Sequence, residues 1–436
     1  MEKLLLTNDT AMQLYNEVRD LPIIDYHCHL DPIAIAQNHM LGCIGEIWLK
    51  ADHYKWRAMR LCGVDEEYVT GNTSYKDKFV RFAECLPKLI GSPVYTWSKM
   101  ELKQIFGIDV ILNSYSAEKI YVEATANIKG KTVLDILQQF RVEYIATTDD
   151  PIDNLEFHGR HSGIVVAPTF RPDRAFCAGK AYLRALEIVC GYKITNIADL
   201  KRALTDRLDY FVSHNCKLSD HCFESLEELI SDSEAQRIFD KVKPTNKEQD
   251  CFYTYMLYCM AGEYAKRGIS MQLRFAVMRD CNSKMLKAIG ADGGFDIIGQ
   301  QTNLQRLAEL LDALDSQDKL PRTILYSLNP NDLSVLTVLS GAFRRVQVGP
   351  AWWYNDTAGG IRKHLEAVSE LAVLGTDLGM LTDSRSFSSY VRFDFFRRIL
   401  ASFVGEKINN GEYDKMFAAG LMQNICYNNS KELVEL

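Results

Sequence analysis

Short runs of β-branched, aromatic and other apolar residues recur along this chain and alternate with longer stretches of helical periodicity. Eight of the short runs have the length and composition of strands: residues 23–27, 142–148, 163–169, 216–220, 271–277, 323–328, 346–351 and 378–383. In the stretches between them, apolar residues return every three or four positions, as in residues 304–314 and 362–374. Strands that alternate with helices pair in parallel, so the pattern predicts an α/β fold, a (β/α)8 TIM-like barrel.

The longest interval between two runs follows the first one. About 115 residues separate it from the second run, far more than one crossover helix needs. We therefore expect residues 33–139 to form a large helical insertion after strand one, within a single domain of residues 1–436. Loops after the carboxyl ends of barrel strands build the active-site face, so the insertion is expected to form part of the active-site wall. A second helical elaboration is expected at 220–268, and closing helices at 390–404 and 413–425.

Composition and charge exclude several classes of function. The chain is 47% hydrophobic and 25% charged, a normal balance for a soluble globular protein. Its net charge of −7 argues against binding to nucleic acid or to an anionic membrane. No apolar stretch has the length of a transmembrane helix, and the N-terminus lacks the apolar core of a signal peptide. The twelve cysteines are scattered without a CxxC pair, which indicates reduced thiols and a cytoplasmic protein.

Two histidines close the first run, within the sequence Asp-Tyr-His-Cys-His-Leu-Asp-Pro of residues 25–32. Successive side chains of a strand alternate between its faces, so His27 and His29 are expected to point the same way. Two imidazoles with this spacing form half of a site for a divalent metal such as zinc. A pair of ordinary histidines at a strand end is the alternative.

A carboxylate, Asp383, follows the last run. Strand eight of a barrel closes beside strand one, so Asp383 could complete the metal site of His27 and His29 or act as a base beside it. On its own, this aspartate would be interpreted as the N-cap of a helix over residues 387–400. Together with His27 and His29 it favours the metal site.

A His-x-His at the end of strand one with an Asp at the end of strand eight resembles the amidohydrolase superfamily. Longer stretches narrow the resemblance to the uronate (glucuronate) isomerases. They occur in the order of that family and cover most of the chain: residues 25–32, 53–57, 93–97 with Glu101-Leu102, 147–151, 170–173, 219–221, 294–296, 352–356 and 382–387.

The resemblance implies one divalent metal, zinc in the first place or Mn, Co or Fe, surrounded by His27, His29 and Asp383. It also implies the residues that hold or act on a sugar acid: His53 and Tyr54 from the insertion, Arg171, Asp220, Trp352, Trp353 and Arg385. The chemistry of these residues agrees with such a ligand. Arginine binds a carboxylate through charge-assisted, often bidentate contacts, and tryptophan offers a flat apolar wall.

Strand five departs from the family pattern. Many uronate isomerases have Gln-Leu-His there, whereas this chain has Gln272-Leu273-Arg274. A guanidinium cannot ligate a metal, so the metal would have at most three protein ligands. Arg274 would instead favour the substrate carboxylate. The carboxylated lysine of two-metal amidohydrolases has no evident counterpart, which favours one metal.

The expected reaction is the interconversion of D-glucuronate and D-fructuronate, or of D-galacturonate and D-tagaturonate, by proton transfer through an enediol. Tyr54 is the candidate for the transfer between carbons and Asp383 for the transfer among hydroxyls, and these roles could be exchanged. His53 and Arg385 complete the candidate catalytic group. A metal-dependent hydrolase of a small amide, ester or lactone is the first alternative, and a non-catalytic sugar-acid sensor the second. The preferred uronate stays open, and a homo-oligomer is compatible with the sequence.

Overall fold

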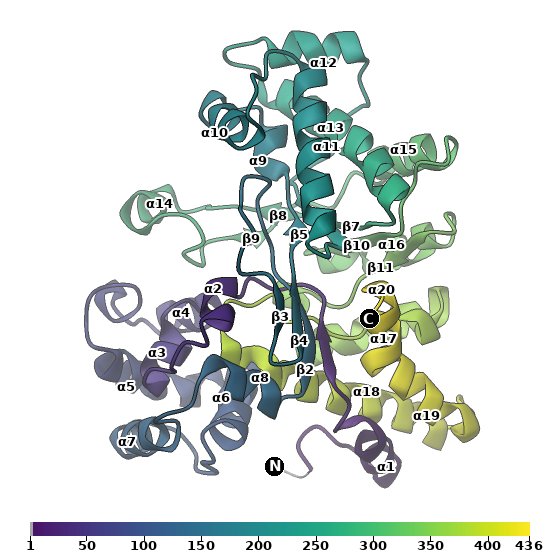
Figure 1. Cartoon of the computed structure of the whole chain (residues 1–436). Coiled ribbons are helices and arrows are strands. Elements are labelled where there is room, and N and C mark those ends of the chain that lie inside the picture. Colours follow the sequence, from purple (N-terminus) through teal and green to yellow (C-terminus); the bar gives the residue numbers. More distant parts are fainter. Residues whose placement is uncertain (1–2) are drawn as a thin grey trace.

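The computed structural model describes residues 3–436 and shows parallel strands between two groups of helices (Figure 1). The strands are β1 (Ile23–Asp25), β2 (Val142–Ala146), β3 (Gly159–His161), β4 (Ile164–Ala167), β5 (Thr169–Phe170), β6 (Leu218–Cys222), β7 (Ser270–Phe275), β8 (Val277–Met278), β9 (Ile297–Ile298), β10 (Thr323–Ser327) and β11 (Val346–Val348). Hydrogen bonds order them as β1-β2-β4-β3, β11-β10-β7-β6-β5 and β8-β9.

The first two sheets are joined where Pro168 separates β4 from β5, because Asp149 beyond β2 forms a parallel bridge with Phe170 of β5. Along this joined wall, from β1 through β2, β4/β5, β6, β7 and β10 to β11, neighbours follow chain order and pair in parallel. The expected α/β fold with parallel strands is thus confirmed, and seven of the eight predicted runs lie in this wall.

The eighth predicted run, residues 378–383, is not a regular strand, so that part of the prediction is wrong. It still lies beside the end of β1, where the Asp383 amide donates to the His27 carbonyl at 3.1 Å. The Thr382 amide donates to the buried Asp25 carboxylate at 3.0 Å instead of to a backbone carbonyl. Left-handed φ angles at Gly379 (+74°) and Asp383 (+45°) also interrupt the extended backbone. The Asp25 side chain therefore accepts a hydrogen bond that a backbone carbonyl would accept in a regular parallel strand pair.

The insertion after β1 is helical, as expected. It consists of α2 (Pro32–Ala36), α3 (Ile44–Leu49), α4 (His53–Leu61), α5 (Tyr75–Cys85), α6 (Pro93–Gln104), α7 (Ala117–Asn127) and α8 (Val133–Gln139). Its own apolar centre forms around Trp48, which packs against Phe79 and Phe82 at ring distances of 5.6 Å. Asp52 begins α4 by accepting hydrogen bonds from the Tyr54 and Lys55 amides, so this cap fixes where His53 and Tyr54 lie.

The other helices cover the remaining strands and close the chain. They are α1 (Asp9–Val18), α9 (Asp173–Phe176), α10 (Lys180–Cys190), α11 (Ile197–Ser213), α12 (Asp232–Phe239), α13 (Asn246–Arg267), α14 (Ser283–Ile289), α15 (Leu304–Asp315), α16 (Leu333–Ser340), α17 (Ala358–Leu371), α18 (Val391–Asn409), α19 (Lys415–Gln423) and α20 (Asn429–Leu433). The expected second elaboration contains α12 and α13, and the expected closing helices are α18 and α19. Within residues 3–436, no helix has both the length and the apolar character required to cross a membrane.

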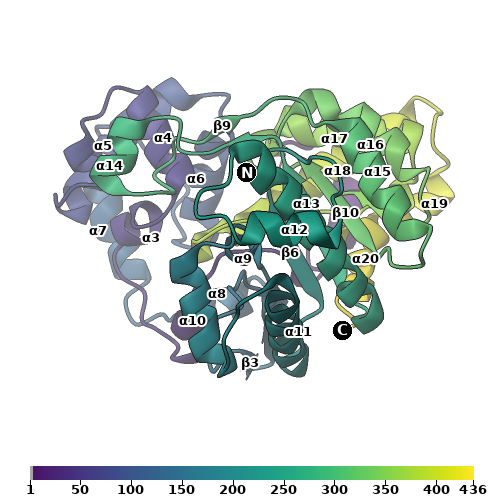
Figure 2. The same cartoon turned by 90° about the horizontal axis from the view of Figure 1, so that it is seen from above.

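An unpredicted element follows β7. The short strands β8 and β9 pair antiparallel and carry α14 at their far end. Seen from the side and from above, α14 lies over the insertion, away from α15 to α19 (Figures 1 and 2). In this arrangement the residues just before β9 lie against α4, near the carboxyl ends of the strands.

Candidate active site

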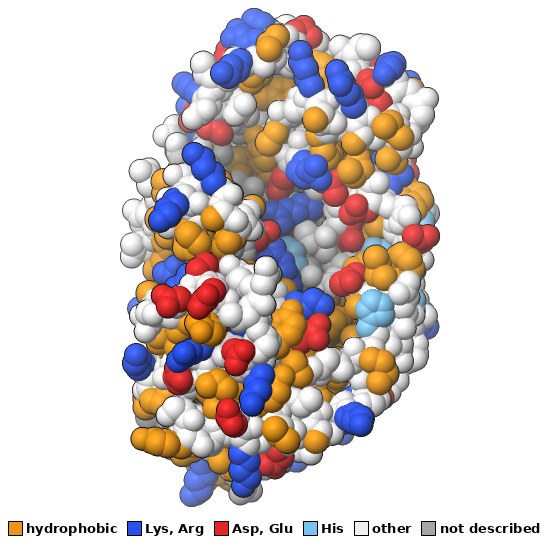
Figure 3. Space-filling view, turned by 90° about the vertical axis from the view of Figure 1, so that its left-hand side faces the viewer, with side chains coloured by type: hydrophobic (Ala, Val, Ile, Leu, Met, Phe, Trp, Pro, Cys, Tyr) orange, Lys and Arg blue, Asp and Glu red, His pale blue; other side chains and the backbone are white. Residues whose placement is uncertain are grey.

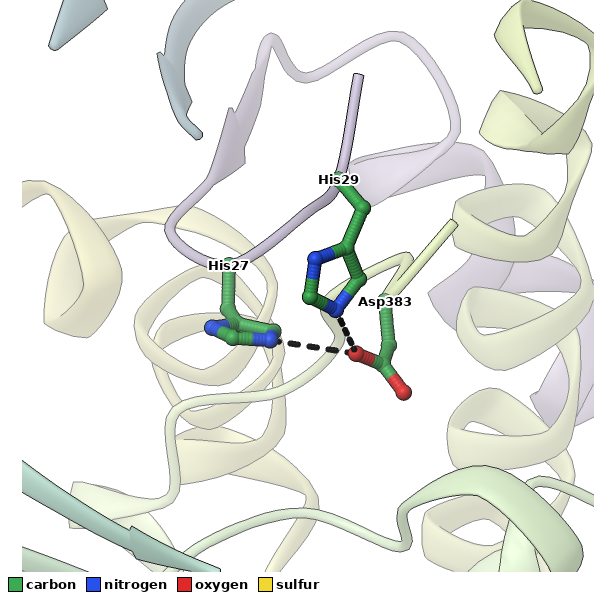
Figure 4. A group of neighbouring side chains, drawn as sticks. All are labelled: His27, His29 and Asp383. Atoms are coloured by element: carbon green, nitrogen blue, oxygen red, sulfur yellow. Dashed lines mark hydrogen bonds and ion pairs between the residues drawn. The ribbon is translucent and has the colours of Figure 1, made fainter. Parts of the chain in front are cut away.

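His27, His29 and Asp383 meet where β1 ends, although 356 positions separate the first from the last (Figure 4). His27 Nε2 and His29 Nε2 lie 3.0 and 3.2 Å from the same oxygen, Asp383 Oδ1. One donor atom from each residue fits within a 4.8 Å group. The sequence prediction that these three residues converge is therefore confirmed.

The donor set fits a divalent metal. In a tetrahedral site with ligands about 2.0–2.1 Å from zinc, neighbouring donor atoms are about 3.3 Å apart. The two observed nitrogen–oxygen distances of 3.0 and 3.2 Å are close to that separation. Burial lowers the pKa of His29 to about 4, which keeps its imidazole in the neutral form that ligates metals. Among residues 3–436, buried His27 Nδ1 has no hydrogen-bond partner that would orient its ring.

Arg274 and Trp352 hold the Asp383 carboxylate from the other side. The Arg274 guanidinium donates to Oδ1 at 3.1 Å, and the Trp352 indole donates to Oδ2 at 2.7 Å. Burial alone would raise the pKa of Asp383, but hydrogen bonds from His27 and His29 and the Arg274 charge hold it well below its usual range. The carboxylate is thus an ion that accepts hydrogen bonds on both oxygens.

Arg274 points inward but is paired with protein carboxylates. It binds Asp220 in a bidentate manner, with nitrogen–oxygen distances of 2.7 and 2.6 Å, and Arg171 lies 3.4 Å from the same aspartate. The strand register explains this pairing, because β6 and β7 are neighbours at this level. Burial would raise the pKa of Asp220, yet Arg274 and Arg171 lower it strongly. Arg274 therefore links Asp220 to Asp383 instead of presenting a free guanidinium.

A cavity of about 590 Å³ opens above His29 and Asp383. It lies in the size range of ligand sites, about 300–1,000 Å³. Five arginines and seven aspartates line it, so it offers guanidinium groups for an acid and carboxylates for hydroxyls. The hollow is visible near the middle of the face in Figure 3, with basic and histidine side chains at its bottom.

Seven of the predicted site residues line the cavity: His29, His53, Arg171, Arg274, Trp353, Asp383 and Arg385. Four others lie immediately behind its wall: His27, Tyr54, Asp220 and Trp352. All the predicted residues therefore gather around one cavity, in two layers.

Tyr54 belongs to the layer behind the wall. Its ring stacks on that of His53 at 4.9 Å, and the Arg392 guanidinium covers it at 4.7 Å from the ring centroid. Burial raises the pKa of Tyr54 well above its usual value, against the opposing charge of Arg392. Burial also lowers the pKa of His53. The pair thus presents a neutral imidazole to the cavity with a protonated phenol behind it.

Both tryptophans lie at the site because the chain bends between them: Trp352 donates to Asp383, and Trp353 lines the cavity. An extended backbone would place Trp352 and Trp353 on opposite faces, but Trp353 has a left-handed φ of +55° and begins a 3₁₀ turn. Trp352 is buried against Tyr326 at a ring distance of 6.4 Å, whereas Trp353 lies 5.6 Å from His53. Sequence alternation alone gave no sign of this bend.

Sequence reasoning did not assign the other residues of the cavity wall, and among these Arg279, Asp292 and Asp296 form ion pairs at its rim. Arg279 pairs with Asp296 at 2.8 Å and stacks on Trp353 at 5.2 Å. Asp292 pairs with Arg385 at 2.9 Å. All three belong to the unpredicted element between β8 and β9. Residues 294–296 carried part of the family resemblance, but their spacing gave no chemical reason to assign them to the site.

Comparison with known proteins covers the whole chain. The family described as glucuronate isomerase matches residues 1–434. A uronate isomerase of Clostridium perfringens is 41% identical over 98% of this chain and 97% of its own length. A crystal structure of a uronate isomerase from Thermotoga maritima superimposes with a TM-score of 0.95 at 32% identity, covering 99% of both chains. A glucuronate isomerase from Caulobacter crescentus gives 0.94 at 26% identity, over 100% of this chain and 96% of that one.

Proposed function

The chain belongs to the glucuronate isomerase family of aldose–ketose isomerases, and from this premise we propose that the cavity above His29 and Asp383 is its active site. The convergence of two imidazoles and one carboxylate at the bottom of a cavity lined by arginines carries this assignment. Family membership favours isomerisation over hydrolysis of an amide, ester or lactone on the same set of residues.

We propose one divalent metal, held by His27, His29 and Asp383. Two imidazoles and a carboxylate suit zinc first, and also Mn, Co or Fe. The bound metal would supply a Lewis acid that polarises sugar oxygens. Arg274 supports a single metal, because a permanently charged guanidinium 3.1 Å from Asp383 Oδ1 would repel a second cation and cannot ligate one.

The arginines of the cavity suit the carboxylate of a hexuronate. Arg171 and Arg385 retain 25% and 33% of their side-chain exposure, so their guanidinium groups are accessible from the cavity. Trp353 provides a flat wall beside them, and the aspartates can accept hydrogen bonds from sugar hydroxyls. This division of contacts supports a small acidic sugar as the substrate.

Isomerisation requires the removal of a proton from the carbon next to the carbonyl and its return to the neighbouring carbon of the enediol. His53 faces the cavity as a neutral imidazole, and Tyr54 stacked behind it is a protonated phenol. We assign this pair to the transfer between carbons. Asp383, an ionised carboxylate at the bottom of the cavity, is assigned to the movement of protons among hydroxyls.

Substitution of the two assigned groups tests the function. Asp383→Asn and Tyr54→Phe should each reduce kcat for conversion of D-glucuronate or D-galacturonate by about 10²–10⁴-fold, the usual contribution of general acid–base catalysis. The binding of either uronate should change much less. Initial rates with both sugars also show which one is preferred. If both variants turn over at nearly the wild-type rate, the assignment is wrong.

We also propose that the protein is cytoplasmic. All twelve cysteines are unpaired, and several are buried, which supports a reducing environment such as the cytoplasm.

A further inference from the structure

The segment of residues 276–299, here called the flap, leaves the strand wall at the end of β7. The left-handed φ of Ala276, +60°, turns the chain away from β7, and the Gly299 amide closes the base by donating to the Ala276 carbonyl at 2.8 Å. Its helix α14 has no buried residue. The flap is therefore held by contacts at its base and along its edge, and not by an apolar core.

The edge of the flap contacts both the insertion and the turn after β11 at the cavity mouth. On the insertion side, Arg60 donates to the Gly293 carbonyl at 2.5 Å and covers the Phe295 ring at 4.3 Å. From the turn after β11, the Tyr354 hydroxyl donates to the Asp296 carbonyl at 2.6 Å. These polar contacts place residues 292–296 over the cavity.

Beside the contact at Gly293, the Asp292 carboxylate lies 2.9 Å from the Arg385 guanidinium. This is the only ion pair that Arg385 makes within residues 3–436. Both side chains are partly exposed, 33% for Arg385 and 54% for Asp292, so the pair can exchange partners without exposing an apolar surface. Arg385 is also one of the two guanidinium groups assigned above to the acid of the substrate.

We infer that Asp292 occupies, on Arg385, the place that the carboxylate of the substrate takes, and that binding of a uronate exchanges one carboxylate for the other. Asp292 is then a specificity-determining residue, because a sugar without an anionic group gains nothing from displacing it. This inference rests on the proposed function, in which Arg385 binds the acid of the substrate.

The opposite role for Asp292 makes the opposite prediction. If its carboxylate accepted hydrogen bonds from sugar hydroxyls, its removal would weaken binding of every sugar. If it competes with the substrate for Arg385, its removal strengthens binding of charged sugars alone. Whether the affinity rises or falls therefore distinguishes the two roles. A comparison of charged with uncharged ligands distinguishes competition for Arg385 from a general loosening of the flap.

The experiment compares dissociation constants for D-glucuronate and for its uncharged amide, D-glucuronamide, by calorimetry. Asp292→Asn should bind D-glucuronate about two- to fivefold more tightly, since partly exposed ion pairs contribute that much. Its affinity for D-glucuronamide should stay at the wild-type value. Asp280→Asn is the matched control, because Asp280 lies on the same flap and makes no ion pair with Arg385.

Arg60→Ala separates competition from loosening. It removes the contact with Gly293 without freeing Arg385, so it should change the affinity for both ligands by the same factor. Weaker or unchanged binding of D-glucuronate to Asp292→Asn, or equal tightening of both ligands, would overturn the inference. A wild-type enzyme that converts no uronate would instead overturn the proposed function, whichever way Asp292→Asn behaves.

Discussion

At the scale of single residues, the site depends on how buried charges are paired. Arg274 satisfies two carboxylates at once, Asp220 through two hydrogen bonds and Asp383 through one. A histidine at this position would offer a metal ligand but could not bind Asp220 in a bidentate manner. The departure from the family pattern at Arg274 is thus coupled to the carboxylate on the neighbouring strand.

Removal of Arg274 should leave a buried anion without its partner. Arg274→Met is expected to lower the free energy of unfolding by about 3–5 kcal/mol, because breaking a buried pair costs that much. The double variant Arg274→Met/Asp220→Asn should recover part of this loss, since it removes the unpaired charge as well. Urea unfolding of the three proteins measures both effects. Equal stability of Arg274→Met and the wild type would show that Arg274 does not neutralise Asp220.

Some residues of the site could be predicted because they follow the carboxyl ends of strands, where (β/α)8 barrels have their catalytic residues. His27 and His29 are of this kind, because they follow the end of β1. Asp383 follows a run that is not a regular strand, but its amide bonds to the His27 carbonyl and so brings it to the same place. Asp292 and Arg279 could not be predicted. They follow no strand of the wall, and only the tertiary path of the flap brings them to the cavity.

At the scale of elements, a buried group of charges inside the insertion holds α4, which carries His53 and Tyr54, against α6. The Lys55 ammonium lies 2.9 Å from Asp52 and 3.3 Å from Glu101 of α6. Burial raises the pKa of Glu101 to about 7, against the opposing charge of Lys55. Below that pH this group consists of the Lys55 ammonium, the Asp52 carboxylate and the neutral Glu101 acid.

This arrangement predicts how stability depends on pH. Glu101 has a pKa near 7 when folded and 4.5 as its ordinary value, so the folded state retains a proton that the unfolded state loses between those pH values. The contribution of Glu101 to stability is therefore complete below about 4.5 and decreases as the pH rises through 7. In Glu101→Gln this decrease should be absent.

Thermal unfolding from pH 4.5 to pH 8 tests the prediction. The difference in stability between the wild type and Glu101→Gln should change across the window, whereas the exposed Glu118→Gln on α7 should follow the wild type. Parallel curves for the wild type and Glu101→Gln would contradict the assigned pKa.

The elements themselves could be predicted where periodicity is strong. Seven predicted runs lie in the wall because their composition and length are those of strands, and the helical insertion could be predicted from the long interval after the first run. The run of residues 378–383 has the composition of a strand, but the Asp25 carboxylate takes the Thr382 amide and interrupts the ladder. The flap was not predicted because β8 and β9 have two residues each, too few to show an alternation of apolar and polar positions.

At the scale of the whole molecule, the site joins the two ends of the chain. The Asp383 amide donates to the His27 carbonyl and the His29 amide to the Ser384 carbonyl, so the end of β1 and the segment that follows α17 are fixed together at the candidate metal ligands. The insertion covers one side of the cavity, and the flap reaches across to it. The three parts that surround the cavity therefore come from distant regions of one chain.

The central claim is that His27, His29 and Asp383 hold one metal at the site of uronate isomerisation. The most direct test is the rate of D-glucuronate conversion by metal-stripped enzyme as Zn²⁺ or Mn²⁺ is added back. The account predicts a rate near zero without metal and full recovery at one equivalent per chain. A stripped enzyme that keeps its full rate, or recovery that requires two equivalents, would contradict it.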